Sequence, residues 1–152
     1  MKLTLQQKED LPETEILVRY AAMTSQLSHM VRYIRQYEYT VEGVLDNKTY
    51  YLPLENILYF DTVERKTFLY TPDNFYECKK NISELENELS QTTVVRIGKG
   101  LLLNVSALLN VKPYPNHRLL AEISSGETLI VSRKYIPLLQ ERIRRAFYEK
   151  SI

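Results

Sequence analysis

The stretch ILYFDTVERKTFLYT, residues 57–71, decides the fold class of this chain. Its two arms, Ile57–Val63 and Thr67–Thr71, are rich in β-branched and aromatic residues, which favour strands. The tight polar segment 64–66 separates them, as a turn separates the two strands of a hairpin. The stretch therefore predicts two antiparallel strands joined by a short turn.

The sequence on either side continues this pattern of short strands. Upstream, Thr40–Asp46 and Thr49–Leu54 flank a turn signal at residues 46–48. Downstream, five further segments read as strands: Phe75–Lys79, Val94–Ile97, Asn110–Tyr114, Arg118–Ile123 and Thr128–Val131. Residues 98–100 interrupt the second of these, and Leu101–Asn104 continues apolar. Short strands that recur about every 8–12 residues are typical of antiparallel sheets. We therefore predict a mainly β domain with short helices, α+β overall.

Three helices are expected. The first has an apolar stripe at helical spacing, formed by Leu27, Met30, Val31, Ile34 and Tyr37, with Thr24 or Ser25 as its cap. The second is short and is capped by Asn81, with Glu84 as the reciprocal partner and with Ile82, Leu85 and Leu89 facing the core. The third runs from about Ser132 to Tyr148, with Pro137 in its first turn and a stripe of Ile136, Leu139, Ile143 and Phe147.

The pattern divides the chain into an N-terminal extension, residues 1–43, and a main domain, residues 44–152. The extension is expected to consist of a loose leader, a short strand at Ile16–Tyr20 and the first helix. The apolar stripe of that helix either packs on the main domain or forms a dimer surface. The sequence leaves both open.

Composition indicates a folded protein of the cytoplasm. Among 152 residues, 44% are hydrophobic and 26% charged, which is ordinary for a globular chain. The single cysteine excludes an internal disulfide, and neither a signal peptide nor an apolar run of membrane-spanning length is visible. The net charge of +1 does not announce a nucleic-acid binder, so DNA binding would require locally placed cations.

The sequence offers no catalytic, cofactor or metal site that we can assemble. His29 and His117 lack neighbours at metal-ligand spacing, and no phosphate-cradling glycine loop is present. The carboxylates of residues 84–88 fit a solvated helix face. Cys78 is either an ordinary strand cysteine or a thiol activated by Lys79 and Lys80. We therefore do not expect an enzyme.

Five stretches in register carry a resemblance to a known family. They are LPLENILYF at 52–60, RKTFLY at 65–70, ISELE at 82–86, VRIGKG at 95–100 running on to Leu103-Asn104, and LIVSRKY at 129–135. In this order and spacing they resemble the LytTR DNA-binding domain of bacterial transcription regulators. The match covers roughly residues 44–147. It implies antiparallel sheets with short edge helices, and a protein that reads successive major grooves of double-stranded DNA through loops.

The resemblance also implies which residues contact DNA. Four cations of this chain lie at positions that correspond to the base-reading loops of the family: Arg65, Lys66, Lys99 and Arg133. Lys134 lies beside the last of these, Arg96 matches a family arginine with a structural or phosphate role, and Asn116 and Arg118 lie in a turn that reaches the DNA backbone. Surface turns also carry Lys or Arg without binding anything, but three such loops together favour DNA.

The chain departs from the family pattern in two places. Gly98 and Gly100 flank Lys99 where polar residues are usual, so this loop is either looser or able to approach DNA closely. The chain is also too short for a receiver domain, which implies a stand-alone regulator controlled by its abundance, by a regulatory partner protein or by self-association as a homodimer, through the N-terminal helix or on DNA. The rival interpretations are a protein-interaction module that keeps the fold without binding DNA, an enzyme, and a single-stranded RNA binder that uses some of the 12 tyrosines.

Overall fold

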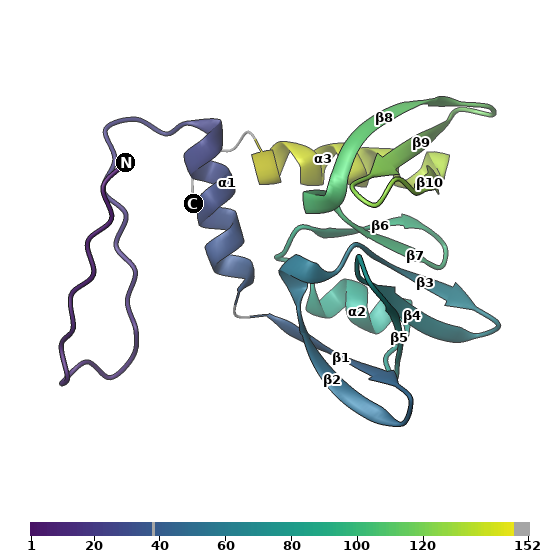
Figure 1. Ribbon diagram of the computed structural model, residues 1–152. Helices are drawn as coiled ribbons and strands as arrows, with labels where there is room; N and C mark the ends of the chain where they lie inside the picture. Colours follow the sequence, from purple (N-terminus) through teal and green to yellow (C-terminus); the bar gives the residue numbers. More distant parts are fainter. Residues whose placement is uncertain (38, 148–152) are drawn as a thin grey trace.

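The computed structural model describes residues 1–37 and 39–147, and Figure 1 shows their arrangement. Within these described residues, ten strands form two sheets, and their antiparallel pairing is as the sequence predicts. The larger sheet contains β1 (Thr40–Leu45), β2 (Lys48–Pro53), β3 (Tyr59–Val63), β4 (Lys66–Tyr70), β5 (Phe75–Cys78), β6 (Val94–Gly98) and β7 (Leu101–Asn104), in the order β2-β1-β5-β4-β3-β7-β6. The smaller sheet contains β8 (Leu108–Tyr114), β9 (Arg118–Ile123) and β10 (Thr128–Val131), in the order β10-β9-β8.

Each face of the larger sheet is covered by its own hydrophobic core. Alternation along β3 shows how: Phe60 enters the core shared with α2 (Ile82–Glu88), while Tyr59 enters the core shared with α3 (Ile136–Phe147) and the smaller sheet. Leu85 of α2 and Leu139 of α3 are 1% and 0% exposed. Residues of β3, β6 and β7 enter both cores, so the strands from which the β3–β4 and β6–β7 turns leave are packed on both faces of the sheet.

A buried asparagine ties the connections between these strands together. Asn104 is 1% exposed and follows β7 into the short 3-10 helix η2 (Val105–Ala107). Its amide nitrogen donates to the carbonyl of Ile57 at 2.9 Å and to that of Leu54, in the 3-10 helix η1 (Leu54–Asn56), at 3.2 Å. Its amide oxygen accepts from the Thr93 hydroxyl at 2.6 Å. Every polar group of this side chain is thereby satisfied inside the core.

The helices begin close to where the sequence predicts. Helix α1 spans Ser25–Gln36, and the Thr24 hydroxyl caps it by accepting from the Leu27 amide at 3.1 Å. Asn81 and Glu84 form the predicted capping box of α2. The third helix begins later than expected, because residues 133–135 form the separate 3-10 helix η3 (Arg133–Tyr135). Its expected end at Tyr148 lies outside the described residues.

The expected strand at Ile16–Tyr20 is wrong for the single chain. The segment has strand composition, but it lies exposed in an arm formed by residues 1–24 that stands clear of both sheets (Figure 1). A strand requires a neighbour for its backbone groups, and no described residue of the chain supplies one. The expected division between residues 43 and 44 falls inside β1, and it stays a proposal.

Candidate nucleic-acid interface

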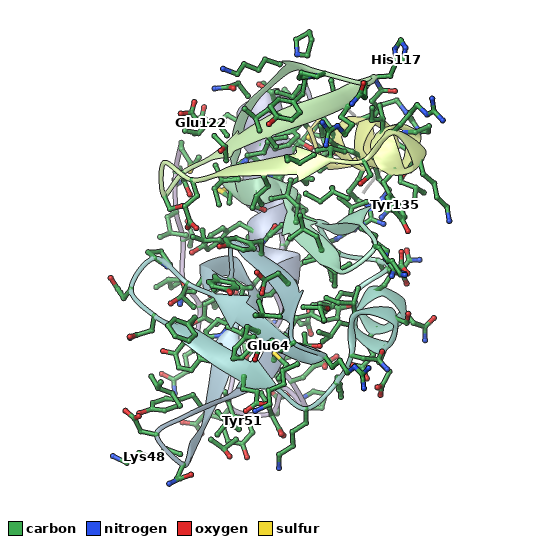
Figure 2. The ribbon with its side chains drawn as sticks, turned by 90° about the vertical axis from the view of Figure 1, so that its right-hand side faces the viewer. Lys48, Tyr51, Glu64, His117, Glu122 and Tyr135 are labelled. Carbon is green, nitrogen blue, oxygen red and sulfur yellow. The ribbon has the colours of Figure 1, made fainter. Side chains whose placement is uncertain are left out.

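Four turns lie at one end of the molecule, on the right-hand side of Figure 1. They contain residues 64–66, 99–100, 116–118 and 133–135, which we call the loop face. Figure 2 views the molecule from this side, with Glu64 near the centre, Tyr135 above it and His117 towards the top. All the DNA-contacting residues inferred from the sequence belong to the loop face except Arg96, which lies on β6 just before residues 99–100.

Backbone hydrogen bonds join three of these turns into one unit. The amide of Thr62, next to the β3–β4 turn, donates to the carbonyl of Gly100 at 2.9 Å. The amide of Ser132, just before η3, donates to the carbonyl of Ile97 at 2.9 Å. The β6–β7 turn is therefore held between the β3–β4 turn and η3. The structure brings the cations of these three turns to the same side.

The β3–β4 turn places Arg65 at the tip of a tight hairpin. Glu64 and Arg65 have φ values of 52° and 68°, the left-handed conformation that two-residue hairpin turns of type I′ require. Arg65 is exposed. Lys66 begins β4, and its Nζ atom lies 4.0 Å from the Glu77 carboxylate, a loose surface pair that is largely exposed to solvent.

Arg96 braces the Lys99 turn from behind. Its Nε atom donates to the Gly98 carbonyl at 3.1 Å, and a second guanidinium nitrogen donates to the Lys99 carbonyl. A third interaction reaches Glu86 of α2 at 3.2 Å, and the Arg96 side chain is 18% exposed. Charge-assisted bonds of this kind fix a loop more firmly than neutral ones. In this structure Arg96 positions the turn that carries Lys99.

The two glycines beside Lys99 serve close packing. A Cβ atom at Gly100 would lie 3.1 Å from the Thr62 side chain, and one at Gly98 would lie 3.3 Å from Cβ of Leu101. Neither glycine has a positive φ, so backbone freedom does not explain them. Protein atoms therefore lie in the space that side chains at these two positions would occupy.

η3 displays two cations around an aromatic ring that the sequence reasoning missed. Arg133 and Lys134 are exposed, and Lys134 Nζ lies 5.5 Å from the centre of the Tyr135 ring. The Arg96 guanidinium approaches the same ring at 5.8 Å. Such cation–π contacts hold a side chain without neutralising its charge. The only sequence signal for Tyr135 was its place next to the two cations.

The β8–β9 hairpin forms the fourth turn. Asn116 and His117 have φ values of 65° and 59°, and both are exposed at the tip. Arg118 is held back from the tip: its Nε atom donates to the Pro115 carbonyl at 2.9 Å, and its guanidinium lies 4.9 Å from the Tyr114 ring. This arrangement leaves the remaining guanidinium donors of Arg118 available beside the turn.

The loop face concentrates positive charge in a nearly neutral protein. Its residues include one carboxylate, Glu64, and six cations: Arg65, Lys66, Lys99, Arg118, Arg133 and Lys134. Arg65, Lys99 and Arg133 make no side-chain hydrogen bond or ion pair with any residue that the structure describes. Unpaired cations on one side create the local potential that attracts a polyanion, which the net charge of +1 conceals.

The remaining titratable candidates lie elsewhere and are structurally engaged. Cys78 is 6% exposed, and burial, with a smaller effect from the Glu77 charge, raises its thiol pKa to about 12. The ordinary strand cysteine is therefore the correct alternative. His29 approaches an Arg32 nitrogen at 2.6 Å, and its pKa is lowered by burial and by that charge. Within residues 1–37 and 39–147, no three His, Cys, Asp or Glu side chains are grouped as metal ligands.

Comparison with known proteins identifies the family. The model of the LytTr DNA-binding domain matches residues 47–144. The chain belongs to the LytTR family. This family is a class of DNA-binding domain rather than a class of enzyme. In the described part of the chain, no helix is long and apolar enough to cross a membrane.

Two proteins are similar to this LytTR chain, one in sequence and one in structure. The sensory transduction protein LytT of Enterococcus faecalis is 20% identical over 98 residues, which is 64% of this chain and 40% of that protein. The LytTr DNA-binding domain of a Bacillus cereus protein, described as a methyl-accepting/DNA response regulator, superimposes with a TM-score of 0.64 at 18% identity. That match covers 68% of this chain and 95% of the solved one. The predicted mainly β LytTR fold is thus confirmed.

Proposed function

We propose that the protein is a cytoplasmic transcription regulator that binds specific double-stranded DNA sites through the loop face. The observation that carries this proposal is that Arg65, Lys99 and Arg133 lie on three turns whose flanking backbone is hydrogen-bonded together, through Thr62 to Gly100 and through Ser132 to Ile97. The names of the two similar proteins, a sensory transduction protein and a DNA response regulator, agree with a role in regulated transcription.

The free cations have the chemistry needed to read bases in the major groove. Arg and Lys donate to O6 and N7 of guanine, and an arginine can do so with two parallel hydrogen bonds. Arg65, Lys99 and Arg133 are exposed and unengaged, so we assign them to base contacts, together with Lys66, whose pair with Glu77 is loose and exposed.

The engaged cations fit supporting roles. Lys134 and Arg118 lie against tyrosine rings, which fixes their direction, and we assign them, with Asn116, to phosphate contacts. Phosphate contacts fix the register of a protein on DNA without reading sequence. Arg96 is assigned to positioning, because its guanidinium is occupied by Glu86 and by two turn carbonyls.

Selection of bound sequences from a random duplex pool, at near-physiological salt, tests the proposal. We expect a recovered motif, and an Arg133→Ala variant should bind the selected site about 1–3 kcal/mol more weakly, as loss of a bidentate guanine contact predicts. Arg35→Ala is the matched control, because Arg35 is exposed on α1, away from the loop face. Absence of any enriched sequence would contradict sequence-specific binding.

One observation favours the alternative, a protein-interaction module that keeps the fold. Glu64 lies at the tip of the β3–β4 hairpin beside Arg65, where a carboxylate would repel phosphates. On DNA, a carboxylate is also able to accept from the amino group of cytosine, which makes Glu64 compatible with base reading. Weak binding with equal affinity for all selected and unselected duplexes would support the alternative.

A further inference from the structure

The segment Thr14–Tyr20 has the composition of a strand but no strand to pair with. Ile16, Leu17 and Tyr20 are 66%, 76% and 55% exposed. No backbone hydrogen bond joins residues 14–20 to any residue that the structure describes. Exposed apolar residues in a row are costly to leave in water, and an extended backbone with free amides and carbonyls is a template for pairing with another chain.

This segment is complementary to itself in antiparallel pairing. When two copies align about Leu17, Glu15 of each lies opposite Arg19 of the other, and Ile16 of each lies opposite Val18 of the other. Opposite charges and β-branched pairs are the cross-strand combinations that stabilise a sheet. A shift of one or two residues in either direction from this alignment separates Glu15 from Arg19.

The neighbouring helix supplies a surface to cover such a pair of strands. Alternation places Ile16, Val18 and Tyr20 on one side of the ribbon. Only residues 21–24 separate this ribbon from α1, whose apolar stripe of Leu27, Met30, Val31 and Ile34 is only partly buried. Among residues 1–22, Val18 is half-buried and the others are exposed. A two-stranded ribbon alone is marginal in water, so packing on the two α1 helices is needed.

We propose that Thr14–Tyr20 is a dimerisation strand, which pairs with the same segment of a second copy about a two-fold axis at Leu17. A two-fold interface uses the same surface on both copies and must be self-complementary, as this segment is. The arm lies on the opposite side of the molecule from the loop face, so both surfaces can be occupied at once (Figure 1). The proposal does not depend on DNA binding.

Charge reversal tests the proposal, by sedimentation equilibrium of the full chain without DNA. The unmodified protein should dimerise reversibly. Glu15→Arg or Arg19→Glu should weaken dimerisation by roughly three- to thirtyfold, because each places like charges opposite one another at two points of the interface. The double variant with both reversals should restore the original affinity. Both positions are exposed, so the melting temperature of the domain should remain unchanged and serves as the folding control.

Cysteine cross-linking tests the register. Opposed residues in an antiparallel pair have Cα atoms about 4.5–5.5 Å apart, within the range of a disulfide. Leu17→Cys should therefore form a dimer under mild oxidation, whereas Leu11→Cys, on the same exposed arm, should do so much more slowly. The native Cys78 is buried and should contribute little background.

Three results would overturn the proposal. They are a monomer at every concentration, charge reversals that fail to compensate one another, and equal cross-linking at positions 11 and 17. Binding to a selected duplex containing one site would still report on the loop face in each case. A failure of the dimerisation strand is thus distinguishable from a failure of DNA binding.

Discussion

Arg96 and Arg133 carry the same guanidinium group, but the fold leaves them different freedom. Arg96 is 18% exposed and is occupied by Glu86 and by the carbonyls of Gly98 and Lys99. Arg133 is exposed and makes no side-chain hydrogen bond with the described part of the chain. Arg96 therefore holds the Lys99 turn of the loop face in place, whereas the Arg133 guanidinium is free to bind a ligand.

Substitution of Arg96 should cost stability as well as DNA affinity. Arg96→Ala leaves Glu86 and two turn carbonyls without their donor, and we expect a loss of about 1–3 kcal/mol in the free energy of unfolding, measured by urea titration. Arg133→Ala, at an exposed position, should change it by no more than about 0.5 kcal/mol. An Arg96→Ala protein of unchanged stability that loses DNA binding would instead make Arg96 a DNA contact.

At the residue scale, the sequence predicts which cations lie on the turns, but not which of them are held by other residues of the fold. Arg65, Lys99 and Arg133 were recognisable because they follow strands at turn signals that resemble those of the family. The sequence leaves the structural or phosphate role of Arg96 open, because Glu86 lies on a separate helix whose placement depends on tertiary packing. The role of Tyr135 depends on η3, which the helical pattern of the last segment obscured.

Between elements, a cluster of phenols and carboxylates joins the larger sheet to the β9–β10 turn. The Tyr59 hydroxyl donates to Glu127 at 2.8 Å, the Tyr70 hydroxyl donates to Asp61 at 2.9 Å, and the two rings stack 4.3 Å apart. The pKa of Asp61 is raised, chiefly by burial and also by the charge of Glu127, while the bond from Tyr70 opposes this rise. Ionisation of Asp61 therefore lowers the stability of the folded protein.

Removal of that charge should stabilise the fold at neutral pH. A carboxyl whose pKa is raised on folding binds its proton more tightly when folded, so its contribution to stability falls as the pH rises through that pKa. Asp61→Asn keeps an acceptor for Tyr70 and should gain up to about 1 kcal/mol at pH 7. The gain should disappear at acid pH, where Asp61 is protonated. Urea titrations at pH 7 and pH 3.5 measure the difference, and a gain of equal size at both values would contradict the explanation.

Helix α1 packs on α3, and Arg32 makes a polar contact and a ring contact between the two helices. Arg32 donates to the carbonyl of Ala146 at the end of α3, and its guanidinium lies 4.4 Å from the Phe147 ring. Burial lowers the pKa of Arg32. Of the two uses that the sequence left open for this helix, packing on the main domain is seen, and its apolar stripe still remains partly uncovered.

Loss of Arg32 should release α1 without unfolding the sheets. With Arg32→Ala we expect amide hydrogen exchange in α1 to accelerate about tenfold or more, since a charge-assisted bond and a ring contact are lost, while exchange in β3 and β4 stays as it was. Arg35→Ala, on the exposed side of the same helix, is the control. Unchanged protection of α1 would mean that the apolar stripe alone holds it.

Over the whole molecule, local pattern predicted which segments are strands but not which strands are neighbours. The hairpins of β3 with β4 and of β8 with β9 follow from turns within a few residues. The pairing of β3 with β7, and of β1 with β5, joins segments that are distant in sequence and carry no local signal. The strand expected at Ile16–Tyr20 is wrong for a related reason: the composition of the segment favours a strand, but no described residue of the chain pairs with it.

The segregation of charge over the whole molecule predicts how DNA binding responds to salt. Six cations and one carboxylate lie on the loop face of a chain with a net charge of +1. If every cation met a phosphate, the slope of log affinity against log salt would reach about −5 for one copy, and base contacts make it shallower. Lys134→Ala should reduce the slope by about 1 and weaken all sequences alike.

The salt dependence of DNA binding also tests whether two copies paired through the arm bind DNA together through their loop faces. On a duplex with two sites, a dimer paired through Thr14–Tyr20 should show close to twice the slope of one copy on one site, because both loop faces release counterions in a single binding event. Glu15→Arg should return the slope to that of one site, without altering binding to a duplex that has only one. A slope near zero for the unmodified protein would mean that the loop face does not bind the phosphate backbone.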